Sequence, residues 1–296
     1  MTRPQVKPEL FRWARQRAGF ELAQLSRRFP SLGRWESGQR RASQKSVERF
    51  ARAVHVPVEY LYLAEPPVER LPIPDRRAAS NELLGRLSPD LLESVDVCLA
   101  RQAWYRGHRE LVAAADGPRE MVGSVNARSE VVEAAAAIRQ ALGVSLETQR
   151  KPPTWVDGLR KLTERIEALG VLVMSSSVVL NNNRRRLRPE EFRGFTLSDR
   201  LAPLLFVNAA ATKAEQMFTL AHQLAHVWLG QSGVCDAQVT AVPDKEAERW
   251  CDRVALELLV PLEAFRAQQR AGAEQRDEVI RLVRRFKVVR PRCSPS

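Results

Sequence analysis

Two histidines separated by three residues lie in the segment FTLAHQLAHVWLG, residues 218–230. The apolar residues around them predict a helix over residues 212–229, and side chains four apart on a helix project from the same face. His222 and His226 could therefore hold one zinc ion through their imidazole nitrogens, at about 2.0–2.1 Å. The plainer interpretation is two hydrogen-bonded histidines on a partly buried helix, and the pair alone leaves both open.

A catalytic zinc ion needs a third protein ligand and one open coordination position. Residues 244–260, DKEAERWCDRVALELLV, predict a second helix that carries acidic side chains. Spacing ranks Glu248 first, because it lies 22 residues beyond the second histidine, and ranks Asp252, one turn further on, second. Cys235 and Cys251 compete with these carboxylates, since thiolates also bind zinc.

The residue that follows the first histidine departs from the metalloprotease motif H-E-x-x-H, in which the glutamate acts as general base. Gln223 stands at that position. An amide can hydrogen-bond water but cannot accept a proton near neutral pH, so the proton-transfer share of catalysis, on the order of 10²–10⁴-fold, is expected to be lost. Arg193 is a candidate for steadying an oxyanion. These residues predict a zinc site with weak or no peptidase activity.

The elements that must position this site predict an α+β fold in three parts. Residues 1–64 read as short helices with tight turns, which suit an all-α helix-turn-helix domain. Residues 65–127 begin with the Pro-rich stretch EPPVERLPIPDRR and continue as a helical connector, so they are expected to form a linker. Residues 128–296 predict a mostly helical, zincin-like domain with a small β-sheet.

The small sheet is expected from short apolar runs bounded by turn residues. These runs predict strands at 171–175 and 203–208, with one more strand around 192–197. The stretch NNNRRRLRPEEFRGFTLSD, residues 181–199, is otherwise expected to be a polar loop.

The charge of the chain is unevenly distributed. The formal net charge is +12, and residues 1–52 hold 13 Lys and Arg against 4 Asp and Glu, a net charge of +9. A basic end on a more balanced body indicates a polyanionic partner, most simply double-stranded DNA. The alternative is a dimerisation or docking module that keeps the helices without reading DNA.

The candidate recognition helix spans residues 30–37, PSLGRWES. In a helix-turn-helix the second helix enters the major groove, while basic flanks contact phosphates. Trp35 is expected in the core because it lies three residues after Leu32. The candidate DNA-binding residues are Ser31 and Arg34 for bases, and Arg27, Arg28, Arg40, Arg41 and Lys45 for phosphates.

The sequence composition indicates in which cellular compartment the protein works. The polar first eight residues do not resemble a secretion signal, and no stretch reaches the roughly 18 apolar residues of a membrane span. The four cysteines are widely scattered, which favours reduced thiols. We therefore expect a cytoplasmic protein with no membrane contact.

The segment FTLAHQLAHVWLG followed by EAERWCDRVALELLVP resembles the ImmA/IrrE family of bacterial metallopeptidase-like proteins. The family pattern is A-H-E-L-A/G-H and then E-x-x-A-N-x-F-A-x-x-L-L-x-P. The resemblance places the zinc ligands on His222, His226 and Glu248 and the general base on Gln223. Asp252 replaces the usual asparagine of that pattern.

The segments LARQAWYRGH and YLYLAEPPVERLPIPD resemble a subgroup of that family with an N-terminal helix-turn-helix of the XRE, or Cro/repressor, type. The family is associated with cutting or controlling repressors in stress, mobile-element and toxin–antitoxin settings. The resemblance implies a DNA-binding transcription regulator or antitoxin-like protein that works with a repressor or a toxin encoded nearby. Symmetric operators suggest a homodimer. The second hypothesis is an active zinc endopeptidase that cleaves such a partner. The third and simplest hypothesis is a scaffold protein that binds no metal.

Overall fold

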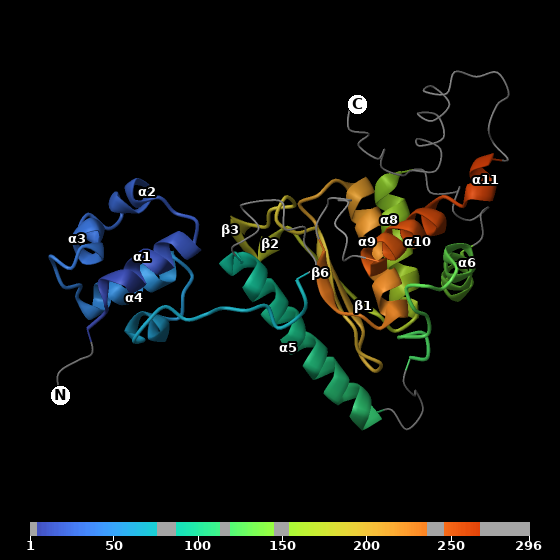
Figure 1. The fold of residues 1–296 in the computed structure, drawn as a ribbon, viewed down its shortest axis with the longest axis horizontal. Coiled ribbons are helices and arrows are strands. Elements are labelled where there is room, and N and C mark those ends of the chain that lie inside the picture. The colour runs from blue at the N-terminus through green and yellow to red at the C-terminus, as the bar shows by residue number, and fades with distance from the viewer. Residues whose placement is uncertain (1–4, 76–86, 113–118, 145–153, 236–245, 267–296) are drawn as a thin grey trace, which may run out of the picture. The chain divides into compact units, whose positions relative to one another are not determined.

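The computed structural model describes residues 5–75, 87–112, 119–144, 154–235 and 246–266 (Figure 1). The chain divides into two compact units, residues 1–72 with 81–95 and residues 73–80 with 96–296. Helices and a small mixed sheet give the α+β composition that the sequence predicts. Among the described helices, none combines the length and apolar character needed to cross a membrane.

Four short helices surround an aromatic core in the first unit. Trp35 is buried there, as predicted, against Phe11 and Phe50. The elements are α1 (Pro8–Arg17), α2 (Leu22–Ser26), α3 (Leu32–Glu36), α4 (Gln44–Ala53) and the 3₁₀ helix η1 (Val58–Tyr62).

A buried ion pair joins α1 to α3. Arg15 donates two hydrogen bonds to the carboxylate of Glu36, Nε to Oε1 at 2.7 Å and Nη2 to Oε2 at 3.0 Å. Both side chains are about nine-tenths buried. A paired guanidinium and carboxylate of this kind link the two helices through a bidentate contact of defined geometry.

The sheet of the second unit has the strand order β1-β5-β4-β6. β1 (Leu172–Ser176) and β5 (Leu204–Asn208) run parallel, whereas β4 (Gly194–Leu197) pairs antiparallel with β5 and with β6 (Gly233–Cys235). The three predicted strands are confirmed. β6 is an addition, because a three-residue strand gives no periodicity to recognise.

The expectation of a polar loop from residue 181 is wrong for its first part. β2 (Val178–Val179) and β3 (Asn182–Arg186) form an antiparallel pair. Leu180 and Asn181 between them have φ values of +46° and +59°. A two-residue connection with both residues at positive φ is the tight hairpin turn that suits twisted strands. Such turns usually contain glycine or asparagine, so the leucine at position 180 made this turn difficult to predict from the sequence.

Helix α9 (Lys213–Leu229) forms the centre of the second unit and confirms the helix predicted over 212–229. It begins at Thr212, whose side chain accepts from Glu215 N while the Glu215 carboxylate accepts from Thr212 N. It ends at Gly230, with φ at +68°. This helix packs against β4 and β5 (Figure 1).

Other helices pack around α9 or continue the chain. Helices α8 and α10 contact α9, and α6 contacts α10 (Figure 1). The Nε1 of Trp250 on α10 donates to Ser129 O at 2.8 Å, which fixes α10 against the segment before α6. The remaining bounds are α5 (Pro89–Val112), α6 (Val131–Ala141), α8 (Trp155–Ala168), α10 (Glu246–Leu259) and α11 (Leu262–Arg266).

Candidate metal centre

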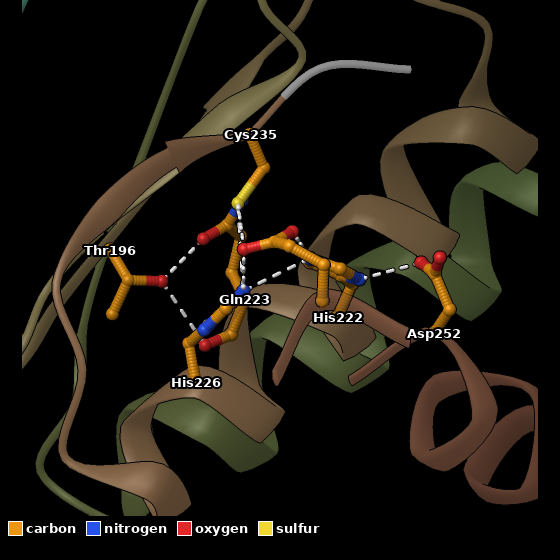
Figure 2. Close-up of polar contacts among 7 residues, drawn as sticks. Thr196, His222, Gln223, His226, Cys235 and Asp252 are labelled. Carbon is orange, nitrogen blue, oxygen red and sulfur yellow. Dashed lines mark hydrogen bonds and ion pairs between the residues drawn. The ribbon is translucent and has the colours of Figure 1, made fainter. Parts of the chain in front are cut away.

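Three elements bring four potential metal ligands together. His222 and His226 come from α9 and Cys235 from the end of β6 (Figure 2). Glu248 comes from the first turn of α10. One ligand atom from each of these residues lies within 4.8 Å of the others. All but Glu248 are buried, and that carboxylate is only 13% exposed. We call these four residues the donor cluster.

The two imidazoles converge on one another and on the carboxylate. The Nε2 atoms of His222 and His226 are 3.1 Å apart, and each is 3.3 Å from an oxygen of Glu248. A neutral imidazole carries one N–H and one acceptor nitrogen. Two such nitrogens turned toward each other and toward an acid are arranged as ligands of a shared cation.

Asp252 contacts the opposite side of the first imidazole. Its Oδ1 lies 2.9 Å from Nδ1 of His222 (Figure 2). A carboxylate on the far nitrogen fixes the tautomer and turns the other nitrogen toward the metal position. The structure therefore separates the two acids that spacing left open: Glu248 joins the donor cluster, and Asp252 orients His222 from behind.

Cys235 lies at the same centre. Its Sγ is 3.5 Å from Nε2 of His226 and 3.9 Å from Oε1 of Glu248. Sequence spacing offers this thiol as a competitor of Glu248, whereas the structure places the two together. Cys251, the other competing thiol, is buried in α10 outside the donor cluster. The pairing of β6 with β4 brings Cys235 to the site, and no local sequence pattern predicts this pairing.

The donor cluster shifts the pKa values of its members in the metal-free state. Burial raises the pKa of Glu248, but hydrogen bonds from His222 and His226 outweigh it and hold that pKa well below its ordinary value. Burial likewise opposes the thiolate of Cys235, and the two imidazoles lower its pKa. The pKa of each histidine is raised in turn, against burial, by the anionic groups beside it. The centre thus favours two anionic donors in a buried position, which suits a divalent cation.

Gln223 is fully buried beside the donor cluster, between α9 and β4. The hydroxyl of Thr196 hydrogen-bonds the side-chain oxygen of Gln223 and lies 3.2 Å from its backbone oxygen (Figure 2). Its Nε2 has no hydrogen-bond partner among the described residues. A Cβ at Gly194 would lie only 3.4 Å from that Nε2, so the strand passes close to the amide. The side chain at the position of the general base is therefore anchored to the sheet.

The other catalytic candidate lies near the start of α9. The Nη2 of Arg193 is 3.0 Å from Oε1 of Glu215, two turns before the first histidine. Glu215 also caps its own helix, and Asp199 pairs with Arg106 at 2.9 Å. Glu215 and Asp199, two acids of the same domain that could accept a proton, are thus held in other contacts. The role of Arg193 stays a prediction.

Among the DNA-binding candidates, Arg34 lies on α3 and Lys45 in the first turn of α4, and the others lie in the segments that connect α2, α3 and α4. Helix α3 is shorter than the predicted residues 30–37, because residues up to Ser31 precede its first turn. Ser31 is half-buried, and its hydroxyl accepts a hydrogen bond from Nη1 of Arg40 at 3.1 Å. The exposed candidates are Arg27, Arg28, Arg34, Arg40, Arg41 and Lys45.

Comparison with known proteins identifies the part of the chain that holds the centre. Residues 166–290 match the Peptidase_M78 family, described as the IrrE N-terminal-like domain. No curated protein matches the chain. The matched range includes the whole donor cluster and Gln223, and it leaves the N-terminal helices outside. The C-terminal part of the chain therefore carries an IrrE N-terminal-like domain of the Peptidase_M78 family, a family of metallopeptidases.

Proposed function

We propose that this protein is a DNA-binding regulator, or an antitoxin-like protein, whose IrrE-like domain binds zinc and has little or no peptidase activity. The N-terminal helices bind double-stranded DNA. The C-terminal domain binds a protein partner, a repressor or a toxin encoded nearby. A homodimer would match a symmetric operator.

The observation that carries the proposal is the state of Gln223. A general base must accept a proton within hydrogen-bond reach of the reacting group. An amide cannot do so, and this one is bound to Thr196 and packed beside Gly194. Glu215 and Asp199 are held by other partners, so neither is free to take over the task.

Zinc fits the residues at the site. The donors are two imidazole nitrogens, a carboxylate and a thiol, all of which zinc accepts. With an open fourth position, bound zinc would act as a Lewis acid on an oxygen held there. His222, His226 and Glu248 would hold it, and Asp252 would keep the first imidazole in the binding tautomer.

The intact histidines and Glu248 are the observation that favours the alternative, an active zinc endopeptidase. The two proposals differ in what restoration of the base would do. We would purify the wild type and Gln223→Glu, measure zinc content, and co-express each with proteins encoded by neighbouring genes. Cleavage by Gln223→Glu alone, or by neither protein, supports the regulator, whereas cleavage by the wild type supports the peptidase. His222→Ala in the Gln223→Glu background is the control, and it should abolish any cleavage.

The DNA-binding half of the proposal rests on the exposed arginines around α3. Binding through phosphates makes the logarithm of affinity fall linearly with the logarithm of salt concentration, with a slope near −0.9 per contact. Removing Arg40 and Arg41 together should reduce that slope by about 2. The matched control removes Arg160 and Lys161, two exposed charges of α8 in the other unit. Equal slopes for both double variants would refute the phosphate assignment.

A further inference from the structure

We infer that Cys235 is a fourth protein ligand of the metal, so that the site is coordinatively closed and serves structure rather than hydrolysis. The inference rests on the zinc binding of the proposed function and deepens it. A zinc site for hydrolysis keeps three protein ligands and one open position, whereas a structural site has four protein ligands. The difference lies in whether the thiolate of Cys235 takes the fourth position.

The spacing of the donor atoms is that of a small tetrahedron. With bonds of about 2.0–2.1 Å to nitrogen or oxygen and 2.3 Å to sulfur, tetrahedral ligands lie about 3.3 Å apart, and sulfur lies about 3.5 Å from the others. The two Nε2 atoms are 3.1 Å apart; that of His222 is 3.3 Å from Oε2 of Glu248, and that of His226 is 3.3 Å from Oε1 of the same carboxylate. The sulfur of Cys235 is 3.5 Å from the nearer imidazole and 3.9 Å from the carboxylate. The thiol therefore lies near the fourth corner, and a small shift toward Glu248 would complete the tetrahedron.

The backbone of β6 holds Cys235 at that corner. Cys235 lies opposite Gly194 of β4, and its carbonyl oxygen accepts from Arg193 N at 3.2 Å. On the other edge of the strand, Val234 N donates to Pro74 O at 3.0 Å. The strand is thus bonded on both sides, and the thiol is buried. A substrate would have to displace a ligand that the sheet keeps in place.

Charge at the site supports the same conclusion and connects it with Gln223. Zinc carries a charge of +2, which the thiolate of Cys235 and the carboxylate of Glu248 balance, while the two imidazoles are neutral. Zinc binding releases the thiol proton to solvent. A glutamate at position 223 would add a third buried anion, which is costly without a partner. A neutral glutamine suits a site whose charge is already balanced.

Cobalt substitution tests the thiolate directly. We would load the full-length protein with Co²⁺ and record its absorption spectrum. The expected result is the intense visible bands of tetrahedral cobalt together with a near-ultraviolet thiolate-to-cobalt charge-transfer band. Cys235→Ser should lose the charge-transfer band and bind zinc more weakly, by more than the about 10–100-fold typical of an outer-shell change. Cys98→Ser, a buried thiol of α5, is the matched control and should keep both.

X-ray absorption at the zinc edge of the wild type needs no variant and stays decisive if Cys235→Ser does not fold. One sulfur at about 2.3 Å with three lighter ligands supports the closed site. A shell of nitrogen and oxygen alone overturns it and leaves the zinc-binding proposal intact. A purified protein that retains no zinc and takes up none overturns both.

Discussion

Oδ1 of Asp252 lies 2.9 Å from Nδ1 of His222, on the side of the imidazole that faces away from the second histidine. The carboxylate is four residues beyond Glu248 on α10, so one face of this helix supplies both a donor and the group that orients another donor. Such a pair is common at zinc sites, where a carboxylate that accepts from the far imidazole nitrogen makes the histidine a stronger ligand.

We expect Asp252→Asn to weaken zinc binding by about 10–100-fold, because the amide can accept a hydrogen bond from Nδ1 but brings no negative charge. Competition with a chromophoric chelator measures the effect. Glu246→Gln, an exposed acid in the first turn of the same helix, is the control and should leave affinity unchanged. Equal affinity of Asp252→Asn and wild type would show that Asp252 does not orient the ligand.

The pH dependence of the metal-free protein follows from its histidines. Burial lowers the pKa of His222, but its hydrogen bonds to Asp252, Cys235 and Glu248 outweigh burial and raise that pKa well above 6.5. A raised folded-state pKa gives stability that is fully present below the unfolded value and is lost as pH rises through the folded value. The metal-free protein should therefore lose stability above about pH 6.5.

Zinc needs neutral imidazoles and behaves in the opposite way. The increase in Tm that zinc produces should grow between about pH 6 and pH 8. Thermal unfolding with zinc and with excess chelator, at matched ionic strength, gives this difference. An increase that shrinks with rising pH would contradict the assignment of the histidines as ligands.

Gly194 is expected to tolerate no side chain. A Cβ there would lie 2.5 Å from the carbonyl oxygen of Phe206 and 2.8 Å from Cγ2 of Thr219. Gly194→Ala should lower the free energy of unfolding by at least about 1–3 kcal/mol, the usual cost of overpacking, and should weaken zinc binding because Cys235 pairs with this residue.

A second glycine provides the comparison for that variant. Gly107 lies within α5, and a Cβ there meets no atom within 4 Å. Gly107→Ala should stabilise the protein by about 0.5–1 kcal/mol, because alanine loses less backbone freedom on forming a helix. Denaturant unfolding of both variants measures the two effects, and the same sign for both would refute the steric argument.

The pair of Arg15 and Glu36 predicts a strong effect in the N-terminal unit. Glu36→Ala leaves a buried guanidinium without its carboxylate and should cost about 3–5 kcal/mol. Glu48→Ala, which removes a more exposed acid hydrogen-bonded to Gln44, should cost less than about 1 kcal/mol. Urea unfolding followed by tryptophan fluorescence includes this unit through Trp13 and Trp35, and comparison with the wild type isolates the effect of the variant. A loss below 1 kcal/mol for Glu36→Ala would show that the pair contributes little.

Helix α9 and the placement of Glu248 beside the two histidines could be predicted because their signals are local. Helical periodicity gives the bounds of α9 to within one residue, and the spacing between two adjacent helices restricts which acid can reach the histidines. Trp35 is found in the core for the same reason, since its distance from Leu32 suits one helical face.

The position of Cys235 could not be predicted as firmly, because it depends on pairing between segments far apart in the chain. β6 is three residues long, and its partner β4 lies about 40 residues earlier. The hairpin of β2 and β3 was hidden by Leu180 at a positive φ, where glycine or asparagine would have announced the turn. Sequence patterns give helix faces well and give sheet partners poorly.

The meeting of His226 and Glu248 has a consequence for the unfolded chain. A metal held by both residues closes a loop of about 22 residues. A cross-link of that length lowers the conformational entropy of the unfolded chain, which raises the free energy of the unfolded state by about 3 kcal/mol. Metal loss would therefore loosen the domain even if every folded contact survived. The ion would act as a reversible counterpart of a disulfide, made and broken by metal supply rather than by oxidation.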